Sequence, residues 1–283
     1  MNRLVRDRAC RWLDAGTAAV VVEVVEARGS VPREEGTRML VSRDDVLGTI
    51  GGGHLELKAI ATARTRLAIA AEDPLEEHVP LGPALGQCCG GAVTLRHAPL
   101  SAGLLAAWPA PPPRFTLQLY GAGHVGRAIA DLLGGIDCRV QWIDERESEF
   151  PRGVDLPPHI ERVCVEPVQA EVPLAPAGAF YLVLTHSHDL DLAITEAILK
   201  RGDFGFLGLI GSQTKRARFV RRFEQRGIAP DSLARLTCPI GLPGIEGKEP
   251  EVIAVAVVAQ LLQTAGPASH SGITAPGSDA PGP

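Results

Sequence analysis

The sequence predicts an α/β protein in which an N-terminal α+β domain is followed by a doubly wound, mainly parallel sheet. Short β-branched strands lie close together in residues 1–100, whereas the rest of the chain alternates strands with helices. Four prolines at 109–113 separate the two patterns. We therefore expect an α+β domain over 1–100, a proline-rich linker over 101–113, a second domain over 114–263 and a disordered tail over 264–283.

The composition predicts a soluble cytoplasmic protein. Hydrophobic residues make up 45% and charged residues 22% of the 283 residues. No apolar run reaches the roughly 18 residues of a membrane span, and the segment MNRLVRDRACRWLDAG lacks the apolar core of a secretory signal. Six cysteines in such a chain indicate reduced thiols. The net charge of −5 argues against nonspecific nucleic-acid binding, so we expect neither nucleic-acid nor membrane partners.

The N-terminal half reads as strands that lead into one long helix. Three glycines, Gly51, Gly52 and Gly53, precede His54 at the head of that helix. Such a run permits close backbone approach to a flat or anionic ligand, or serves only as a tight turn. The predicted strands are 18–26, 37–42, 46–50 and 92–97, and the predicted helix is 54–71.

The C-terminal half alternates the two periodicities. Ser212 is placed to cap one helix, and Gly202 and Gly227 to end two of them. The last helix contains VIAVAVVAQLL, which is apolar almost all round, so we expect it to be buried. The predicted strands are 115–120, 138–143, 180–185 and 204–211, and the predicted helices are 124–133, 190–201, 213–226 and one beginning near Pro250.

The segment YGAGHVG holds Gly121, Gly123 and Gly126 between a strand and a helix. In a dinucleotide-binding turn these glycines allow a tight turn, pyrophosphate approach and close helix packing. Asp144 closes the next strand, where a carboxylate meets a ribose hydroxyl, and Arg146 follows it. The pattern predicts a Rossmann-like domain, whose glycines either bind a nucleotide or serve packing alone.

Two further segments follow predicted strands of this domain. The segment THSHDLD places His186 and His188 at the end of a strand, where ligands bind in open α/β sheets. These histidines are interpreted as metal ligands, as proton donors or as lining of the cleft. The acids that follow, Asp189 and Asp191, are candidate helix caps. Gly211 and Ser212, with Lys215 in the following helical turn, form a second candidate anion site. The same helix carries Arg218, Arg221 and Arg222, which are interpreted either as a solvated face or as a docking surface for a partner.

The segment GQCCGG places Cys88 and Cys89 between glycines, beside Gln87. A vicinal disulfide is disfavoured in a reducing compartment, and a zinc site lacks further cysteines at the required spacing. A soft-ligand site or a role in sulfur chemistry remains. The other thiols are interpreted as small core residues at Cys10, Cys138 and Cys164, and as an exposed loop residue at Cys238.

Seven segments together resemble the XdhC/CoxI family of xanthine dehydrogenase accessory proteins. They are GSVPREEGTRMLV, GTIGGGHLE, GQCCGG, YGAGHVG, THSHDLD, GLIGSQTKRARF and CPIGLPGIEGKEPEVIAVAVVAQLL, and the match runs in order from about residue 15 to 263. The resemblance implies a chaperone that binds molybdenum cofactor, protects it during sulfuration and delivers it to the molybdenum subunit of apo-xanthine dehydrogenase. It also implies a homodimer, a cysteine desulfurase partner, no catalytic residues of its own, and a cofactor-binding cysteine at Cys88 or Cys89.

Two other functions stay open at this point. The fold and Asp144 favour an NAD(P)-dependent oxidoreductase, although no hydride-transfer constellation is evident. The paired thiols Cys88 and Cys89 favour a thiol-based sulfur carrier.

Overall fold

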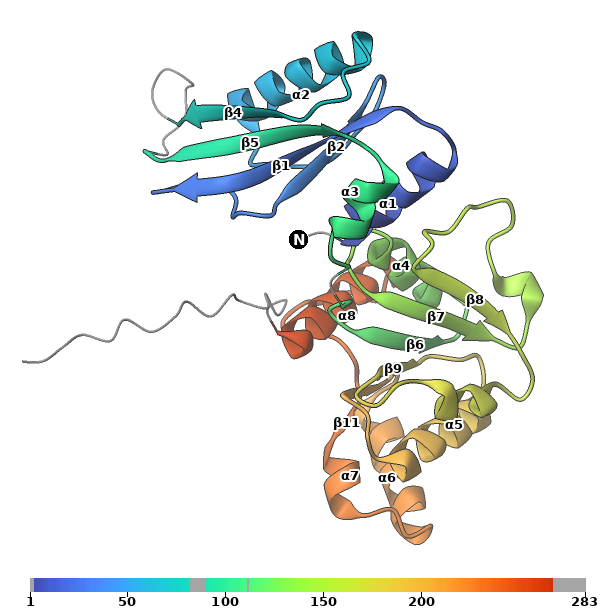
Figure 1. Ribbon diagram of the computed structural model, residues 1–283. Helices are drawn as coiled ribbons and strands as arrows, with labels where there is room; N and C mark the ends of the chain where they lie inside the picture. The colour runs from blue at the N-terminus through green and yellow to red at the C-terminus, as the bar shows by residue number, and fades with distance from the viewer. Residues whose placement is uncertain (1–2, 82–89, 111, 267–283) are drawn as a thin grey trace, which may run out of the picture. The chain divides into compact units, whose positions relative to one another are not determined.

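The computed structural model describes residues 3–81, 90–110 and 112–266 (Figure 1). The chain divides into two compact units, residues 1–112 and 113–283, called here the N-terminal and C-terminal units. Each unit is built on its own sheet, antiparallel in the first and parallel in the second. The fold class predicted from the sequence is confirmed.

The N-terminal unit is a five-stranded antiparallel sheet with the order β3-β2-β1-β5-β4. The central strand, β1, pairs with both β2 and β5 and contains a bulge between Val24 and Glu26. The edge strand β4 was not predicted, because its sequence LEEHVP is mostly polar and exposed. The strands are β1 (Ala19–Arg28), β2 (Arg38–Ser42), β3 (Val46–Gly48), β4 (Leu75–Pro80) and β5 (Ala92–Pro99).

Helices cover both faces of this sheet. On one face, Val20 and Val22 of β1 pack with Leu55 of α2 (Gly53–Ala68). On the other, Val21 packs with residues of α1 (Arg3–Asp14) and of α3 (Ala102–Ala107). β1 is therefore buried on both sides, which explains its run of valines. Residues 101–113, expected to be a linker, begin with α3, whose Leu105 lies in this core.

The C-terminal unit is a six-stranded parallel sheet with the order β11-β10-β9-β6-β7-β8. Counted from its own first strand, this is the order 6-5-4-1-2-3 of the dinucleotide-binding fold. The two outermost strands were not predicted: β11 has only two residues, and β8 is only partly buried. The strands are β6 (Thr116–Tyr120), β7 (Arg139–Asp144), β8 (Ile160–Cys164), β9 (Phe180–Val183), β10 (Phe206–Leu209) and β11 (Leu236–Thr237).

Helices lie on both faces of the parallel sheet, so the unit has three layers (Figure 1). α4 (His124–Leu133) and α8 (Pro250–Ala265) cover one face, where Leu117 and Leu119 point. α5 (His188–Arg201) and α6 (Gln213–Gln225) cover the other, where their core side chains include Ile194 and Phe219. Shorter helical segments are η2 (Glu147–Glu149), η3 (Val168–Leu174) and α7 (Pro230–Ala234).

Several helix ends follow the sequence. The Ser212 hydroxyl accepts a hydrogen bond from the Lys215 N–H, and α5 ends at Gly202, whose φ of 77° is left-handed. Two expectations were wrong. Ser187, rather than Asp189 or Asp191, caps α5, because its hydroxyl accepts from the Leu190 N–H. The last helix is not buried all round either: one face packs in the core, and Val255 on another is 49% exposed.

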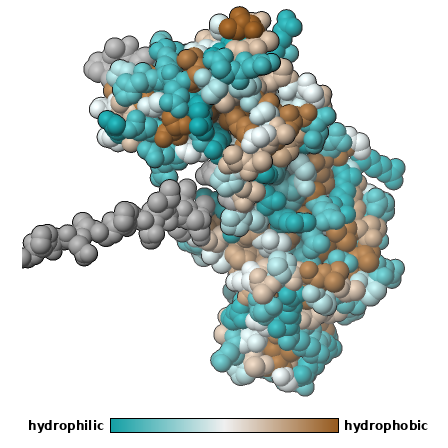
Figure 2. Space-filling view, in the orientation of Figure 1, coloured by the Kyte–Doolittle hydropathy of each residue, from teal (hydrophilic) through white to brown (hydrophobic). Residues whose placement is uncertain are grey.

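The surface is mixed. In the view of Figure 2, hydrophobic residues form small separate patches among hydrophilic ones. Among the described residues, none of the helices has the length and apolar character needed to span a membrane. The tail expected over 264–283 lies outside the described residues from 267 onward.

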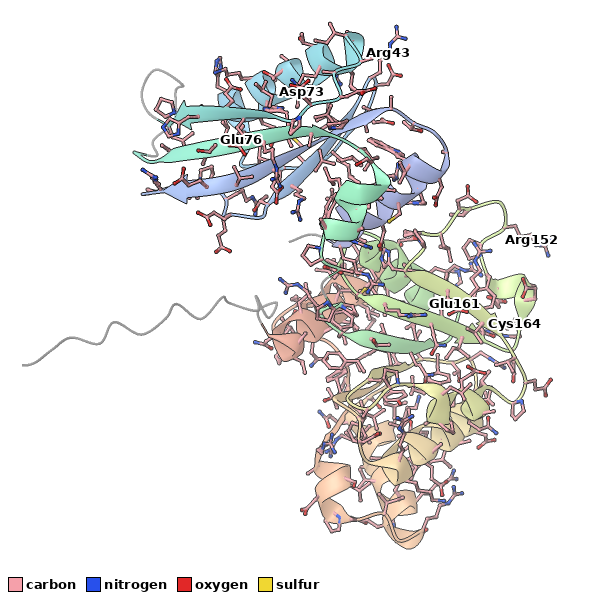
Figure 3. All side chains as sticks on the ribbon, viewed as in Figure 1. Arg43, Asp73, Glu76, Arg152, Glu161 and Cys164 are labelled. Carbon is pink, nitrogen blue, oxygen red and sulfur yellow. The ribbon has the colours of Figure 1, made fainter. Side chains whose placement is uncertain are left out.

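The cysteines outside the GQCCGG segment correct two sequence expectations. Cys164, expected in the core, is exposed at the end of β8, an outer strand of the sheet (Figure 3). Cys238, expected to be exposed, is buried in the core beside α5 and α6, and burial raises the pKa of its thiol. Cys138 is buried as expected, and Cys10 is half-buried. The local sequence pattern did not predict the burial of Cys164 and Cys238. Their burial depends on which strands lie at the edge of the sheet and on contacts with residues far away in the sequence.

Candidate functional site

The switch point of the parallel sheet lies between β6 and β9. These strands are neighbours, yet the helices that follow them, α4 and α5, cover opposite faces. In open α/β sheets this divergence leaves a crevice at the carboxyl ends of the strands, and ligands bind there. The sequence-predicted segments YGAGHVG and THSHDLD both begin at this edge, because each directly follows one of the two strands.

The three glycines after β6 have different roles. A Cβ on Gly121 would lie 2.3 Å from the Leu184 carbonyl oxygen, and one on Gly126 would lie 2.0 Å from the Gly121 carbonyl oxygen. These two positions must therefore be glycine for the fold itself. A Cβ on Gly123 would meet nothing within 4 Å, and Gly123 precedes the first residue of α4. Only this glycine leaves space for a ligand at the helix start.

The carboxylate of Asp144 is held by its own chain. Its Oδ2 accepts from the Ala122 N–H at 2.7 Å, and Arg146 binds both carboxylate oxygens at 3.0 Å. Burial acts to raise the pKa of Asp144, but the hydrogen bonds from Arg146 and Ala122 outweigh it and hold this pKa below its usual value. Asp144 thus stabilises the glycine loop through its hydrogen bond from Ala122. Arg146 binds the same carboxylate that a ribose hydroxyl would contact.

The glycine run before α2 is arranged differently. Glu56 Oε2 accepts from the N–H groups of Ile50 and Gly52, at 3.3 and 3.0 Å, and from the Thr49 hydroxyl at 2.6 Å. A Cβ on Gly51 would overlap Pro32, whereas the space beside Gly52 is open. His54 is exposed in the first turn of α2. The first turn of α2 therefore already carries a carboxylate, which binds the loop before the helix, so this position suits a flat ligand better than an anion.

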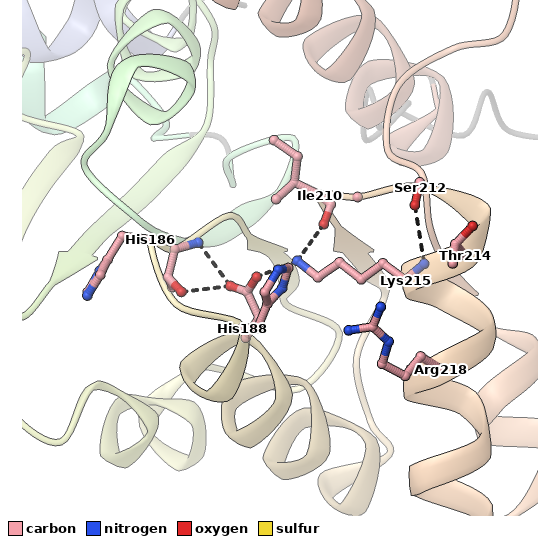
Figure 4. A pocket seen from close by; sticks show the side chains of 10 residues that line it. His186, His188, Ile210, Ser212, Thr214, Lys215 and Arg218 are labelled. Atoms are coloured by element: carbon pink, nitrogen blue, oxygen red, sulfur yellow. Dashed lines mark hydrogen bonds and ion pairs between the residues drawn. The ribbon is translucent and has the colours of Figure 1, made fainter.

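A pocket of about 440 Å³ lies at the carboxyl ends of β9 and β10 (Figure 4). It brings together two segments that the sequence placed separately as candidate sites. The segment after β9 contributes Thr185, His186, His188 and Asp191, and the segment after β10 contributes Ile210, Gly211, Ser212, Thr214, Lys215 and Arg218.

A buried ion pair lies at this pocket. Lys215 Nζ is 2.5 Å from Asp191 Oδ2 and donates to the Ile210 carbonyl oxygen at 2.9 Å. Asp191 Oδ1 accepts from the N–H and the hydroxyl of Thr185, at 3.0 and 2.7 Å. The pairing of Asp191 with Lys215 was not predicted from the sequence. Their positions after neighbouring parallel strands are the one signal that points to it.

The two histidines diverge. His186 Nε2 is 3.7 Å from Glu145 Oε1, a residue that follows β7, whereas His188 lies beside Lys215 in the pocket (Figure 4). Within the described ranges, no group of three or more His, Cys, Asp or Glu side chains is arranged to hold a metal ion. The geometry favours lining and hydrogen bonding for these histidines over joint metal ligation.

The arginines of α6 form an exposed stripe with two parts. Arg218 lines the pocket, and it also borders a neighbouring hollow in the surface with Arg221 and Arg222. All three side chains are exposed, and they lie at the i, i+3 and i+4 spacing of one helix face. Some other arginines pair with acids, as Arg201 does with Asp203. Gln87, Cys88 and Cys89 lie outside the described residues.

Comparison with known proteins agrees with this architecture. Residues 117–261 match the XdhC Rossmann domain family, and residues 12–77 match the XdhC and CoxI family. The chain belongs to the XdhC family. It is 30% identical over 249 residues to YqeB, an uncharacterized protein of Escherichia coli K12. The match covers 86% of this chain and 43% of YqeB, so the chain spans less than half of that relative's length.

A solved structure shares the fold. It is described as a xanthine dehydrogenase from Bacillus halodurans, and it aligns with a TM-score of 0.68 over 93% of this chain and 96% of its own. The sequence identity is 19%, so this likeness supports the fold alone.

Proposed function

We propose that this chain binds molybdenum cofactor, protects it while its terminal sulfur is installed, and delivers it to the molybdenum subunit of apo-xanthine dehydrogenase. Family membership supports the maturation role. The observation that supports ligand binding most directly is the open space at Gly123, at the start of a helix with no acidic residue in its first turn. Free N–H groups at such a helix start attract a phosphate.

The described residues fit a phosphate-bearing cofactor at the carboxyl edge of the parallel sheet. The start of α4 would hold a phosphate through backbone N–H groups, with Gly121 and Gly126 keeping the loop in place. Gly52 offers open space to a flat ring system. We assign the thiols of Cys88 and Cys89, beside Gln87, to the metal end, because a soft metal prefers thiolate ligands. The bound cofactor supplies the molybdenum chemistry of the acceptor enzyme, and this chain binds and orients it.

The proposal includes three features of the assembly. The chain acts as an accessory protein without catalytic residues of its own, it cooperates with a cysteine desulfurase that supplies the sulfur, and it works as a homodimer in the cytoplasm. Family membership supports the accessory role at the general level. The desulfurase and the dimer are tested by co-purification and by the mass in solution.

The strand order favours one second candidate, an NAD(P)-dependent oxidoreductase. The position of Asp144 weighs against NAD, because Arg146 and Ala122 already occupy its carboxylate. Arg146 itself is partly exposed and would suit a 2′-phosphate. Catalysis also needs a hydride-transfer constellation, and in the pocket after β9 and β10 the carboxylate of Asp191 pairs with Lys215 rather than with a histidine. A sulfur carrier that uses Cys88 and Cys89 is the remaining alternative.

One experiment separates these functions. Purified protein is mixed with released molybdenum cofactor and followed by absorbance, with a parallel titration of NADH and NADPH. The proposal predicts a stoichiometric cofactor complex, which the double variant Cys88→Ala/Cys89→Ala retains poorly. Cys164→Ala is the matched control, because it removes an exposed thiol elsewhere. Full cofactor stoichiometry in the double variant would disprove the thiol assignment, and NAD(P)H binding without cofactor binding would favour the oxidoreductase.

The handover needs a surface that meets the acceptor enzyme. We propose that Arg221 and Arg222 dock acidic residues of the acceptor, because charges at an interface rim mainly raise the encounter rate. Arg218 belongs to the same predicted docking surface, but it also lines the pocket. The tested variant therefore keeps Arg218. Arg221→Glu/Arg222→Glu should slow activation of apo-xanthine dehydrogenase at low salt and leave cofactor binding intact. Arg152→Glu, an exposed control on another segment, should not. If the double variant activates apo-xanthine dehydrogenase at the wild-type rate, Arg221 and Arg222 are solvated side chains that do not dock the acceptor.

A further inference from the structure

We infer that the pocket at the ends of β9 and β10 binds a phosphate group through Lys215 and Arg218, with Asp191 and Gly211 as positioning residues. The inference goes beyond the proposed function, because it concerns a second anion site away from Gly123 and does not depend on molybdenum. It is carried by the way the chain holds one lysine at the wall of an open pocket (Figure 4).

The ammonium group of Lys215 is held in place by two hydrogen bonds, and its third N–H donor is available to a ligand. An ammonium group has three N–H donors, and two of them are taken by Asp191 Oδ2 and the Ile210 carbonyl oxygen. The ring of Phe219 lies 5.4 Å from Nζ and adds a cation–π attraction. The lysine side chain is only 11% exposed, so it is held in one place before any ligand arrives.

Asp191 is saturated by its own chain. One of its oxygens accepts from the Thr185 N–H and hydroxyl, and the other pairs with Lys215. The carboxylate is 2% exposed and therefore presents little negative charge to the pocket. The groups left to meet a ligand are donors or cations, namely Lys215, Arg218, His188 and Thr214. Such a lining is complementary to an anion.

Gly211 is needed for this arrangement. Its φ is 156°, and a Cβ at this position would lie 2.5 Å from Cδ of Lys215. The lysine stem thus runs directly across the glycine to reach Asp191. A buried ion pair adds little net stability, because desolvation offsets its attraction. Charged groups of this kind, held in place at a cleft, are typical of functional sites.

A phosphate is the anion that fits best. Arg218 and Lys215 lie three residues apart on α6, so their cationic groups can approach one group from the same helix face. A guanidinium binds two phosphate oxygens at once, and an ammonium binds a third as a point charge. The phosphate can be free or part of a nucleotide or sugar phosphate.

The test titrates the full chain with inorganic phosphate, ribose 5-phosphate and AMP, followed by ³¹P NMR. Wild type should bind all three in the millimolar range or tighter. Arg218→Ala should weaken binding roughly tenfold, the loss expected when one charge-assisted hydrogen bond is removed. Arg221→Ala, on the same helix but outside the pocket, should bind as wild type does. Equal binding of the three probes means that the site recognises phosphate alone, and much tighter AMP binding means that it takes a nucleotide.

Removal of the lysine is tested with its partner replaced as well. Lys215→Met/Asp191→Asn avoids leaving a buried carboxylate unpaired, so the protein should fold, and phosphate binding should fall at least as much as in Arg218→Ala. The same double variant should keep the molybdenum-cofactor stoichiometry of wild type, which separates this inference from the proposed function. No phosphate binding by wild type, equal losses in Arg218→Ala and Arg221→Ala, or full binding by the folded double variant would each overturn the inference.

Discussion

Two turns of this chain lead from a strand through glycines into a helix, and the two helices differ in the charge of their first turn. Before α2, Glu56 in the first helical turn reaches back and accepts from Ile50 and Gly52. Before α4, the first turn has no acidic residue, and the space at Gly123 is open. One helix start is closed by the protein itself, and the other is left for a ligand.

The difference shows what a glycine-rich helix start requires in order to bind an anion. Glycines permit close approach, but the first helical turn must also carry no carboxylate of its own. The first turn of α2 carries Glu56, whereas the carboxylate that binds the loop before α4, Asp144, ends β7 and is paired with Arg146. The strand–glycine–helix pattern is therefore shared by both units, whereas the position of one carboxylate decides its use.

The largest expected effect comes from the glycines that hold the α4 turn. Gly126→Ala should destabilise the protein by about 3 kcal/mol, because its Cβ would overlap the Gly121 carbonyl oxygen and the backbone would have to shift. Gly123→Ala is the matched control and should change stability by less than about 1 kcal/mol. Urea unfolding measures both. If the two substitutions change the free energy of unfolding equally, Gly126 and Gly123 do not have separate roles in packing and in binding.

Gly123→Val tests the open position directly. The side chain would fill the space at the start of α4, so we expect a folded protein whose affinity for molybdenum cofactor falls roughly 10- to 100-fold, through loss of one or two hydrogen bonds to a charged group. Normal affinity in a folded Gly123→Val variant would mean that all three glycines after β6 serve the fold alone.

The closed turn is tested by removing its carboxylate. Glu56→Ala leaves the N–H groups of Ile50 and Gly52 without their partner and should lower the free energy of unfolding by about 1–2 kcal/mol. The control is Glu72→Ala, an exposed residue beyond the end of α2, for which we expect a change within about 0.5 kcal/mol. If urea unfolding gives the same free energy for both variants, the hydrogen bonds from Ile50 and Gly52 to Glu56 do not stabilise the turn.

The smallest expected effect concerns a buried histidine in each unit. His159 lies 3.1 Å from the Leu133 carbonyl oxygen through Nε2, whereas neither ring nitrogen of His97 has a hydrogen-bond partner among the described residues. Burial lowers the pKa of His97, partly offset by Glu77 of β4, and Arg66 of α2 lowers it further. The unfolded chain therefore takes up a proton more readily than the folded chain does.

This difference predicts an acid-sensitive N-terminal unit. The contribution of neutral His97 to stability is complete above about pH 6.5, the pKa in an unfolded chain, and is lost below it by up to about 1.4 kcal/mol per pH unit. His97→Leu should flatten the fall of unfolding free energy between about pH 6.5 and 5. The exposed His54→Gln should not. An unchanged slope in His97→Leu would show that other groups set the acid response.

Much of the fold follows from local patterns. The alternation of strands and helices, the Ser212 cap and the end of α5 at Gly202 were predicted, because a local pattern sets each of them within a few residues. The edge strands β4, β8 and β11 were missed, because they are short or polar and depend on pairing with a distant strand. The roles of the candidate site residues stay predictions for the experiments above.

The sequence alone determined the two kinds of sheet, the family and the segments that supply candidate ligands, because periodicity and motifs act over short stretches of chain. Only the tertiary structure decided which candidate groups remain free for a ligand. It showed that Glu56 occupies one helix start and that Gly123 stays open at the other, and it joined Asp191 to Lys215 across neighbouring strands. These outcomes depend on strand order and on contacts between residues far apart in the chain, which local patterns do not encode.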